Sequence, residues 1–113
     1  MLDDRKASAP YVVVFTPGDP IGCVDQMAPA EASAAVGGFA SQTRWGNKYL
    51  VYHARNRLEA AGAAPNRLID SHVVYGLMIV TGWDKPLAGR QAVELAYDCP
   101  WPMAQLEAYD KPA

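Results

Sequence analysis

The residues of this sequence best suited to acid–base or nucleophilic chemistry are an aspartate–histidine pair and two cysteines. Asp70 and His72 stand two positions apart, so on a β-strand they share one face and the carboxylate can orient the imidazole as a general base. Cys23 and Cys99 are thiols that such a base activates if the fold brings one of them close. These four residues define the hypothesis of a small enzyme or small-ligand-binding domain with a pocket between sheet and helices. Nothing local activates either thiol, which favours buried structural cysteines.

Metal and nucleotide sites receive little support from the spacing of residues. The Asp70–His72 pair offers only two ligands, and no CxxC, HxxxH or HExxH spacing occurs. The stretch TPGDPIGCVD, residues 16–25, follows a hydrophobic run as a phosphate-binding loop does, but Pro17 and Pro20 have no backbone N–H to donate and no lysine follows. We therefore expect no metal and no cofactor, and we interpret residues 16–25 as a rigid connector.

Aromatic and arginine side chains suggest a different function, the binding of another protein. Tryptophan, tyrosine and arginine dominate the energetics of protein interfaces. The residues that we assign to such a surface are Trp45, Tyr52, Arg55, Trp83 and Trp101. Each tryptophan lies at an expected element boundary, where the alternative role is to seal the edge of the core. Our first hypothesis is a non-catalytic binding module of the accessory or inhibitor type, a class common among phage and mobile-element proteins, that docks on a partner or on itself.

The distribution of charge leaves nucleic-acid binding as a second alternative. Residues 44–67 hold five basic residues and one acidic residue, although the whole chain has a net charge of −2 and an isoelectric point near 5.5. An expected helix over residues 44–61 would carry Lys48, Tyr52 and Arg55 along one flank, where they can contact phosphates and stack on bases. The acidic overall balance argues against a dedicated nucleic-acid binder.

Periodicity and turn residues predict the elements that must position these side chains. The runs of apolar residues favour the order strand-helix-helix-strand-strand-helix, an α+β domain with a largely antiparallel sheet and its helices packed on one face. The predicted elements are an interior strand at Tyr11–Thr16, a helix from Pro29 to Thr43 with a break at Gly37-Gly38, a helix at Asn47–Ala61, strands at Ser71–Trp83 and Ala92–Cys99, and a short helix at Pro102–Asp110. A helix remains an alternative for 71–83, because a continuous apolar run lacks a decisive period. Glu94 and Asp98 share a face of the expected strand, which we interpret as solvated.

Length and composition favour one domain. The chain has 113 residues, half of them hydrophobic, which suffices for a single core without metal or disulfide. We expect a flexible N-terminal segment at 1–9 and one domain at 10–113. No apolar run reaches the ~20 residues of a membrane span, and the apolar run near the N-terminus is too short for a secretion signal. We therefore expect a cytoplasmic protein with no membrane contact and reduced cysteines.

Overall fold

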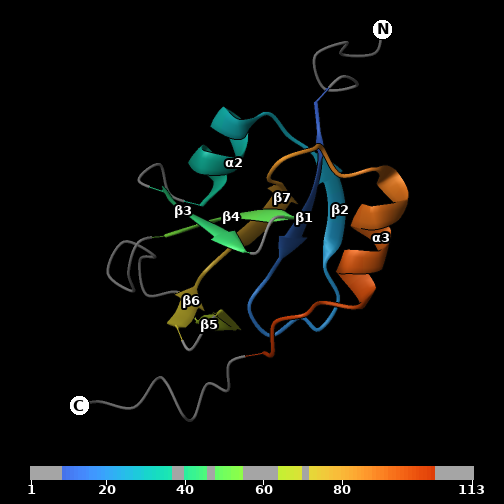
Figure 1. Cartoon of the computed structure of the whole chain (residues 1–113). Helices are drawn as coiled ribbons and strands as arrows, with labels where there is room; N and C mark the ends of the chain where they lie inside the picture. The colour runs from blue at the N-terminus through green and yellow to red at the C-terminus, as the bar shows by residue number, and fades with distance from the viewer. Residues whose placement is uncertain (1–8, 37–39, 46–47, 55–63, 70–71, 104–113) are drawn as a thin grey trace, which may run out of the picture.

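The described part of this chain folds around a mostly antiparallel β-sheet. A computed structural model describes residues 9–36, 40–45, 48–54, 64–69 and 72–103. Within these ranges it contains seven strands and two helices, a small α+β domain (Figure 1). In chain order these are β1 (Tyr11–Phe15), β2 (Cys23–Gln26), α2 (Pro29–Ala35), β3 (Ala40–Trp45), β4 (Tyr49–Ala54), β5 (Pro65–Ile69), β6 (His72–Tyr75), β7 (Met78–Gly82) and α3 (Gly89–Tyr97).

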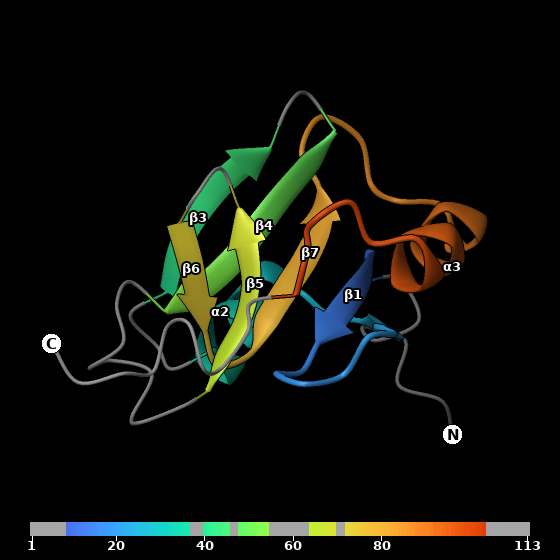
Figure 2. The ribbon, with the colours of Figure 1, turned by 90° about the horizontal axis from the view of Figure 1, so that it is seen from below.

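Five strands form one sheet in the order β2-β1-β7-β4-β3, and every neighbouring pair in it is antiparallel. β5 and β6 pair with each other as a separate antiparallel hairpin, which lies beside β4 (Figure 2). The α+β class and the largely antiparallel sheet agree with the prediction from sequence. The order of elements differs from the predicted strand-helix-helix-strand-strand-helix. In the described ranges, neither helix has the length and apolar character needed to cross a membrane.

The sheet is covered on both faces. On the α3 face, Val13, Phe15 and Val80 pack against α3 and against the β5–β6 hairpin. On the α2 face, Val12 and Ile79 pack against α2. Successive residues of a strand point to opposite faces, so Val12 and Val13 belong to different cores. The prediction that the helices pack on one face is therefore wrong: α2 and α3 lie on opposite sides of the sheet (Figure 1).

β1 and the turn after it agree best with the sequence. The predicted strand is present and lies inside the sheet, between β2 and β7. The backbone N–H of Asp19 donates to the carbonyl of Thr16 at 3.0 Å, and Gly18 has φ +83°. Pro-Gly at the centre of a turn matches this geometry, because glycine adopts positive φ without a steric cost. Residues 23–25 of the predicted connector belong to β2, a strand that the sequence did not predict, and α2 then begins at Pro29.

The predicted helix at Asn47–Ala61 is wrong where the structure describes it, because Tyr49–Ala54 is strand β4. β4 lies between β7 and β3, and both of its faces are covered: Val51 packs on the α3 face and Tyr52 on the α2 face. A strand covered on both sides is apolar along its whole length, so its residues also fill a helical stripe. Residues 55–61 of that prediction lie outside the described ranges.

The predicted strand at Ala92–Cys99 is also wrong, because α3 spans most of it. Ala92, Leu95 and Ala96 are buried, which is helical spacing, whereas Val93 is 47 % and Tyr97 66 % exposed. The alternating pattern in the sequence was misleading, because it treats Val93 and Tyr97 as core residues although both are exposed. Gln91 supports the helix start by accepting the backbone N–H of Ala88 at 2.9 Å.

Three further differences concern boundaries. The predicted helix Pro29–Thr43 ends at Ala35, and Ala40–Trp45 is strand β3. The predicted strand Ser71–Trp83 is strand, but Gly76 with φ +78° divides it into β6 and β7, which belong to different sheets. β5 begins at Pro65 and is a strand that the sequence did not predict. The predicted helix at Pro102–Asp110 lies outside the described ranges from residue 104 onward.

Two polar residues are buried in the described core, Asn66 at 0 % and Arg67 at 1 % exposure. Asn66 Nδ2 donates to the carbonyls of Phe15 at 2.7 Å and Gly76 at 2.8 Å. Arg67 donates to Asn66 Oδ1 at 2.8 Å and to the carbonyl of Asp19 at 2.6 Å, and its guanidinium lies 5.0 Å from the centre of the Phe15 ring. This pair ties β5 to the end of β1, to the turn after it and to the β6–β7 connection.

Candidate functional site

The four residues of the catalytic hypothesis are not gathered where the structure describes them. His72 is exposed at the start of β6, and Asp70 lies outside the described ranges. Cys23 is exposed on edge strand β2, paired with Val14 on the α2 face. Cys99 follows α3 and packs against the core of the α3 face, where its thiol donates to the carbonyl of Trp101 at 3.4 Å. Both cysteines are free thiols.

Because Cys23 is exposed and Cys99 is partly covered, we expect the two thiols to react at different rates. Titration of the folded protein with 5,5′-dithiobis(2-nitrobenzoate) should modify Cys23 faster by about an order of magnitude. The variants Cys23→Ser and Cys99→Ser assign the two phases. Equal rates in the two variants would contradict the partial burial of Cys99.

Two of the predicted interface residues are buried. Trp101 and Tyr52 are each 4 % exposed. Trp101 packs edge-on against Phe15 at 6.3 Å and against Trp45 at 5.3 Å, and it lies in the core of the α3 face. Tyr52 belongs to the core of the α2 face. Side chains this deeply covered have little area to present to a partner, so their role in the folded domain is packing.

Trp83 is different, because 45 % of it is exposed. It follows β7, and its backbone N–H donates to the carbonyl of Lys48 at 2.9 Å. The guanidinium of Arg44 lies 4.8 Å from the centre of the indole, a cation–π contact. The register places Arg44 opposite Leu50 on the α2 face, so Trp83 and Arg44 form a patch at one end of that face. We call these two residues the Trp83 patch. Arg55, the other arginine assigned to an interface, lies outside the described ranges.

The basic flank expected for nucleic-acid binding depends on a helix, and the described residues of that segment do not form one. Residues 40–45 and 49–54 are strands, and Arg44 belongs to the α2 face. Lys48 lies beside the end of β7 instead, where it contacts the backbone of Trp83. Tyr52 is buried on the α2 face, so Lys48 and Tyr52 do not share the expected helical flank, and Arg55 lies outside the described ranges.

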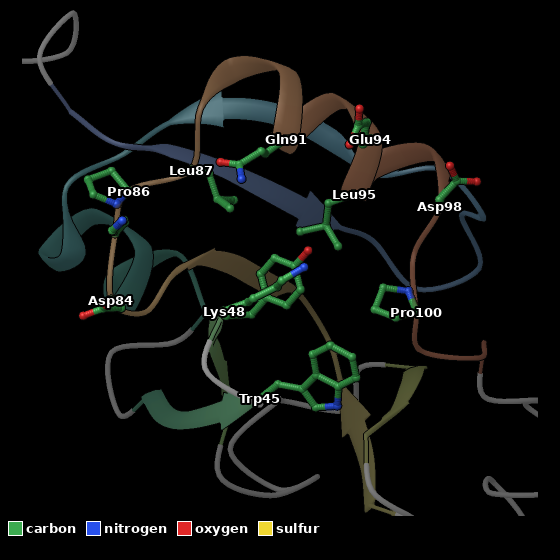
Figure 3. Close-up of a pocket in the computed structure, with 12 residues that line it drawn as sticks. Trp45, Lys48, Asp84, Pro86, Leu87, Gln91, Glu94, Leu95, Asp98 and Pro100 are labelled. Atoms are coloured by element: carbon green, nitrogen blue, oxygen red, sulfur yellow. The ribbon is translucent and has the colours of Figure 1, made fainter.

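A cavity of about 550 Å³ lies beneath α3, on the α3 face (Figure 3). We call it the α3 cavity. Three parts of the chain line it: the β3–β4 hairpin, the connection from β7 to α3, and α3 with two residues after its end. The lining residues are Trp45, Lys48, Tyr49, Asp84, Lys85, Pro86, Leu87, Gln91, Glu94, Leu95, Asp98 and Pro100. Its volume is within the usual range of small-molecule sites, about 300–1,000 Å³.

The aromatic wall of the α3 cavity is a stacked pair. The rings of Trp45 and Tyr49 have centroids 5.7 Å apart and planes inclined by 23°. Both rings also contact Trp101 edge-on, at 5.3 Å and 6.0 Å, which joins the wall to the core. A wall held in this way is rigid and presents a flat apolar surface, the kind of surface on which planar molecules stack.

The charged residues of the α3 cavity differ in orientation. Figure 3 shows Lys48 extending into the space between Leu95 and Trp45. The carboxylates of Glu94 and Asp98 point away from that space. Glu94 also pairs with Arg90 at 3.5 Å on the outside of α3. Lys48 is itself exposed, so the cavity presents a cation that water also reaches.

Metal binding receives no support from the described residues, among which no three His, Cys, Asp or Glu side chains gather as a ligand set. Neither His72 nor the two cysteines line the α3 cavity. Comparison with protein-family models, curated proteins and solved structures gives no match for this chain.

The sequence assigns Trp45 to an interface and Lys48 to a basic flank, whereas Trp83 does not line the α3 cavity. Lys48 and Gln91 are far apart in sequence and meet only because β4 pairs with β7, which leads into α3. Gln91 lies just before the predicted strand Ala92–Cys99, and no sequence pattern placed it near Lys48. The aromatic pair at Trp45 and Tyr49 was the one available signal, since residues four apart across a hairpin face each other.

Proposed function

We propose that this chain is a small non-catalytic protein-binding module that docks through the Trp83 patch. The observation that carries the proposal is an indole that is 45 % exposed and yet held in place. Its backbone is bonded to Lys48 and one side of its ring contacts Arg44. Tryptophan and arginine are the residues most enriched among interface hot spots. An anchor that is already ordered loses little conformational entropy on binding.

The partner that fits this surface is a protein with an apolar or aromatic side chain for the open part of the indole. A second copy of this chain is one such partner. The rival function, an enzyme using His72 with Asp70 and a cysteine, has weaker support. His72 and Cys23 are exposed on separate elements, β6 and β2, and neither borders the α3 cavity.

Trp83→Ala is expected to abolish capture of the partner from an extract of the native cells. Losing a hot-spot tryptophan costs at least about 2 kcal/mol of binding, or roughly 30-fold in affinity. The matched control is Tyr97→Ala, which removes an even more exposed aromatic residue from α3. Proteins recovered with the wild type and with Tyr97→Ala, but not with Trp83→Ala, are the expected partners.

Two measurements distinguish a second copy of this chain, another protein and nucleic acid as the partner. If the partner is a second copy, sedimentation of the purified protein shows a dimer that dissociates in Trp83→Ala. Equal recovery of all partners with Trp83→Ala would contradict the proposal. Recovery of nucleic acid alone, weakened steeply by salt, would favour the nucleic-acid alternative instead.

A further inference from the structure

We propose that the α3 cavity binds small aromatic carboxylates, with the ring of the ligand against Trp45 and Tyr49 and its carboxylate at the ammonium of Lys48. This site is separate from the Trp83 patch and does not depend on it. It lies on the α3 face, whereas Trp83 and Arg44 lie at one end of the α2 face.

The shape of the cavity argues for a planar ligand. One wall is the stacked pair Trp45–Tyr49, and Leu87 and Leu95 lie across from it, on the side of α3 (Figure 3). A flat ring placed between an aromatic wall and aliphatic side chains is removed from water on both sides. Because Trp101 holds the wall from behind, the rings need little rearrangement to receive the ligand.

Two exposed hydrogen-bond donors on the lining of the cavity, Lys48 and Gln91, argue for a negative charge on that ligand. Lys48 extends inward, and an ammonium group donates but never accepts hydrogen bonds. The Gln91 side chain lies along the start of α3 beside Leu87 (Figure 3), and its Oε1 accepts the backbone N–H of Ala88 at 2.9 Å. Its NH₂ group is a second donor. A carboxylate supplies acceptors for both groups.

The acidic residues around the cavity limit the expected preference for a negative charge. Glu94 and Asp98 line the rim with carboxylates pointing away from the interior, and Asp84 points outward at the other end (Figure 3). Glu94 is further balanced by Arg90. These exposed carboxylates weaken the attraction that Lys48 exerts on an anion, and we therefore expect only a small preference for the carboxylate.

A set of three naphthalenes with one ring system and three charges tests the proposal. The probes are 1-naphthylacetate, 2-(1-naphthyl)ethanol and 2-(1-naphthyl)ethylamine, titrated into ¹⁵N-labelled full-length protein at low ionic strength. We expect the carboxylate to bind about threefold to tenfold more tightly than the alcohol, the size of a partly exposed ion pair, and the amine to bind most weakly. Shifted amide signals should include those of Leu87, Gln91 and Leu95.

The variant Lys48→Gln should bring the carboxylate to the affinity of the alcohol and leave the alcohol unchanged. Arg44→Gln is the matched control, because it removes the same charge from the α2 face, on the other side of the sheet. It should preserve the preference for the carboxylate. Trp83→Ala should also preserve it, so failure of this proposal and failure of the protein-binding proposal are distinguishable.

Three results would each overturn the proposal. One is the absence of saturable shifts with all three probes. A second is equal or tighter binding of the amine or the alcohol by the wild type. The third is a set of shifts centred on residues away from the α3 cavity.

Discussion

Replacing Asn66 with alanine is expected to lower the free energy of unfolding by about 3 to 5 kcal/mol, because it leaves several buried groups without partners. Asn66 is fully buried and donates to the carbonyls of Phe15 and Gly76. Its side-chain oxygen also accepts from the guanidinium of Arg67. The substitution removes all three bonds and no water reaches the site in the folded state. Urea denaturation followed by circular dichroism measures the loss.

The variant Arg67→Met is expected to lose less stability than Asn66→Ala. Methionine also removes hydrogen bonds, but it takes away the cost of burying a cation and keeps much of the packing on Phe15. The acceptor that it abandons on the backbone of Asp19 belongs to an exposed turn residue, which water can reach. We therefore expect Arg67→Met to cost about 1 to 2 kcal/mol, less than Asn66→Ala.

Gln42→Ala is the control for both variants, since it removes an exposed amide from β3 and should change stability by less than about 0.5 kcal/mol. An Asn66→Ala protein as stable as Gln42→Ala would show that the buried amide contributes nothing. If Arg67→Met were less stable than Asn66→Ala, Arg67 and not Asn66 would make the larger contribution to stability.

Replacing Gly82 with alanine is expected to destabilise the protein by about 3 kcal/mol and to displace the connection between β7 and α3. A Cβ atom on Gly82 would overlap the carbonyl oxygen of Lys85 and would lie 2.9 Å from its carbonyl carbon and 3.1 Å from the nitrogen of Leu87. These atoms belong to the backbone, so no change of rotamer relieves the overlap. Denaturation measures the stability, and the amide signals of Lys85 and Leu87 report the displacement.

Gly18→Ala is the matched control for that substitution. Gly18 has φ +83°, but a Cβ there meets nothing within 4 Å. Only backbone strain opposes the alanine, about 1 to 2 kcal/mol. We expect Gly82→Ala to be the more damaging variant and the only one of the two that shifts Lys85 and Leu87. Wild-type stability and unshifted signals in Gly82→Ala would contradict the close approach of these two backbone segments.

The sequence predicted elements well where turn residues and apolar content agreed. β1 is an example, because its β-branched run is followed by Pro17 and Gly18, which end the strand in a defined turn. The prediction from sequence failed where the burial of a residue depends on segments that are distant in the sequence. β4 is apolar because two layers cover it, and a fully covered strand carries no period that separates it from a helix. In α3, alanines form the buried stripe, and this left the exposed Val93 to mimic an alternating strand.

For the candidate site residues too, the residue type is visible in the sequence, whereas the burial depends on tertiary contacts. Trp83 was assigned to an interface from its residue type and its position after Gly82, and its exposure keeps it in the proposal. Trp101 has the same type and a similar boundary position, yet it lies in the core. Whether a boundary tryptophan turns inward depends on what packs beside it, here Phe15 and Trp45, and these contacts are tertiary. The α3 cavity likewise exists only after α3 has docked on the sheet.

The pairing of β1 with β7 has a consequence for synthesis of the chain. Val13 pairs with Val80, so β1 lacks one neighbour until synthesis has passed β7. At about 5–20 residues per second, that interval lasts several seconds on the ribosome. Throughout it, the segment Tyr11–Phe15 has an open edge and a strongly β-forming sequence. The nascent chain, rather than the finished domain, is therefore the form most exposed to aggregation and most dependent on chaperones.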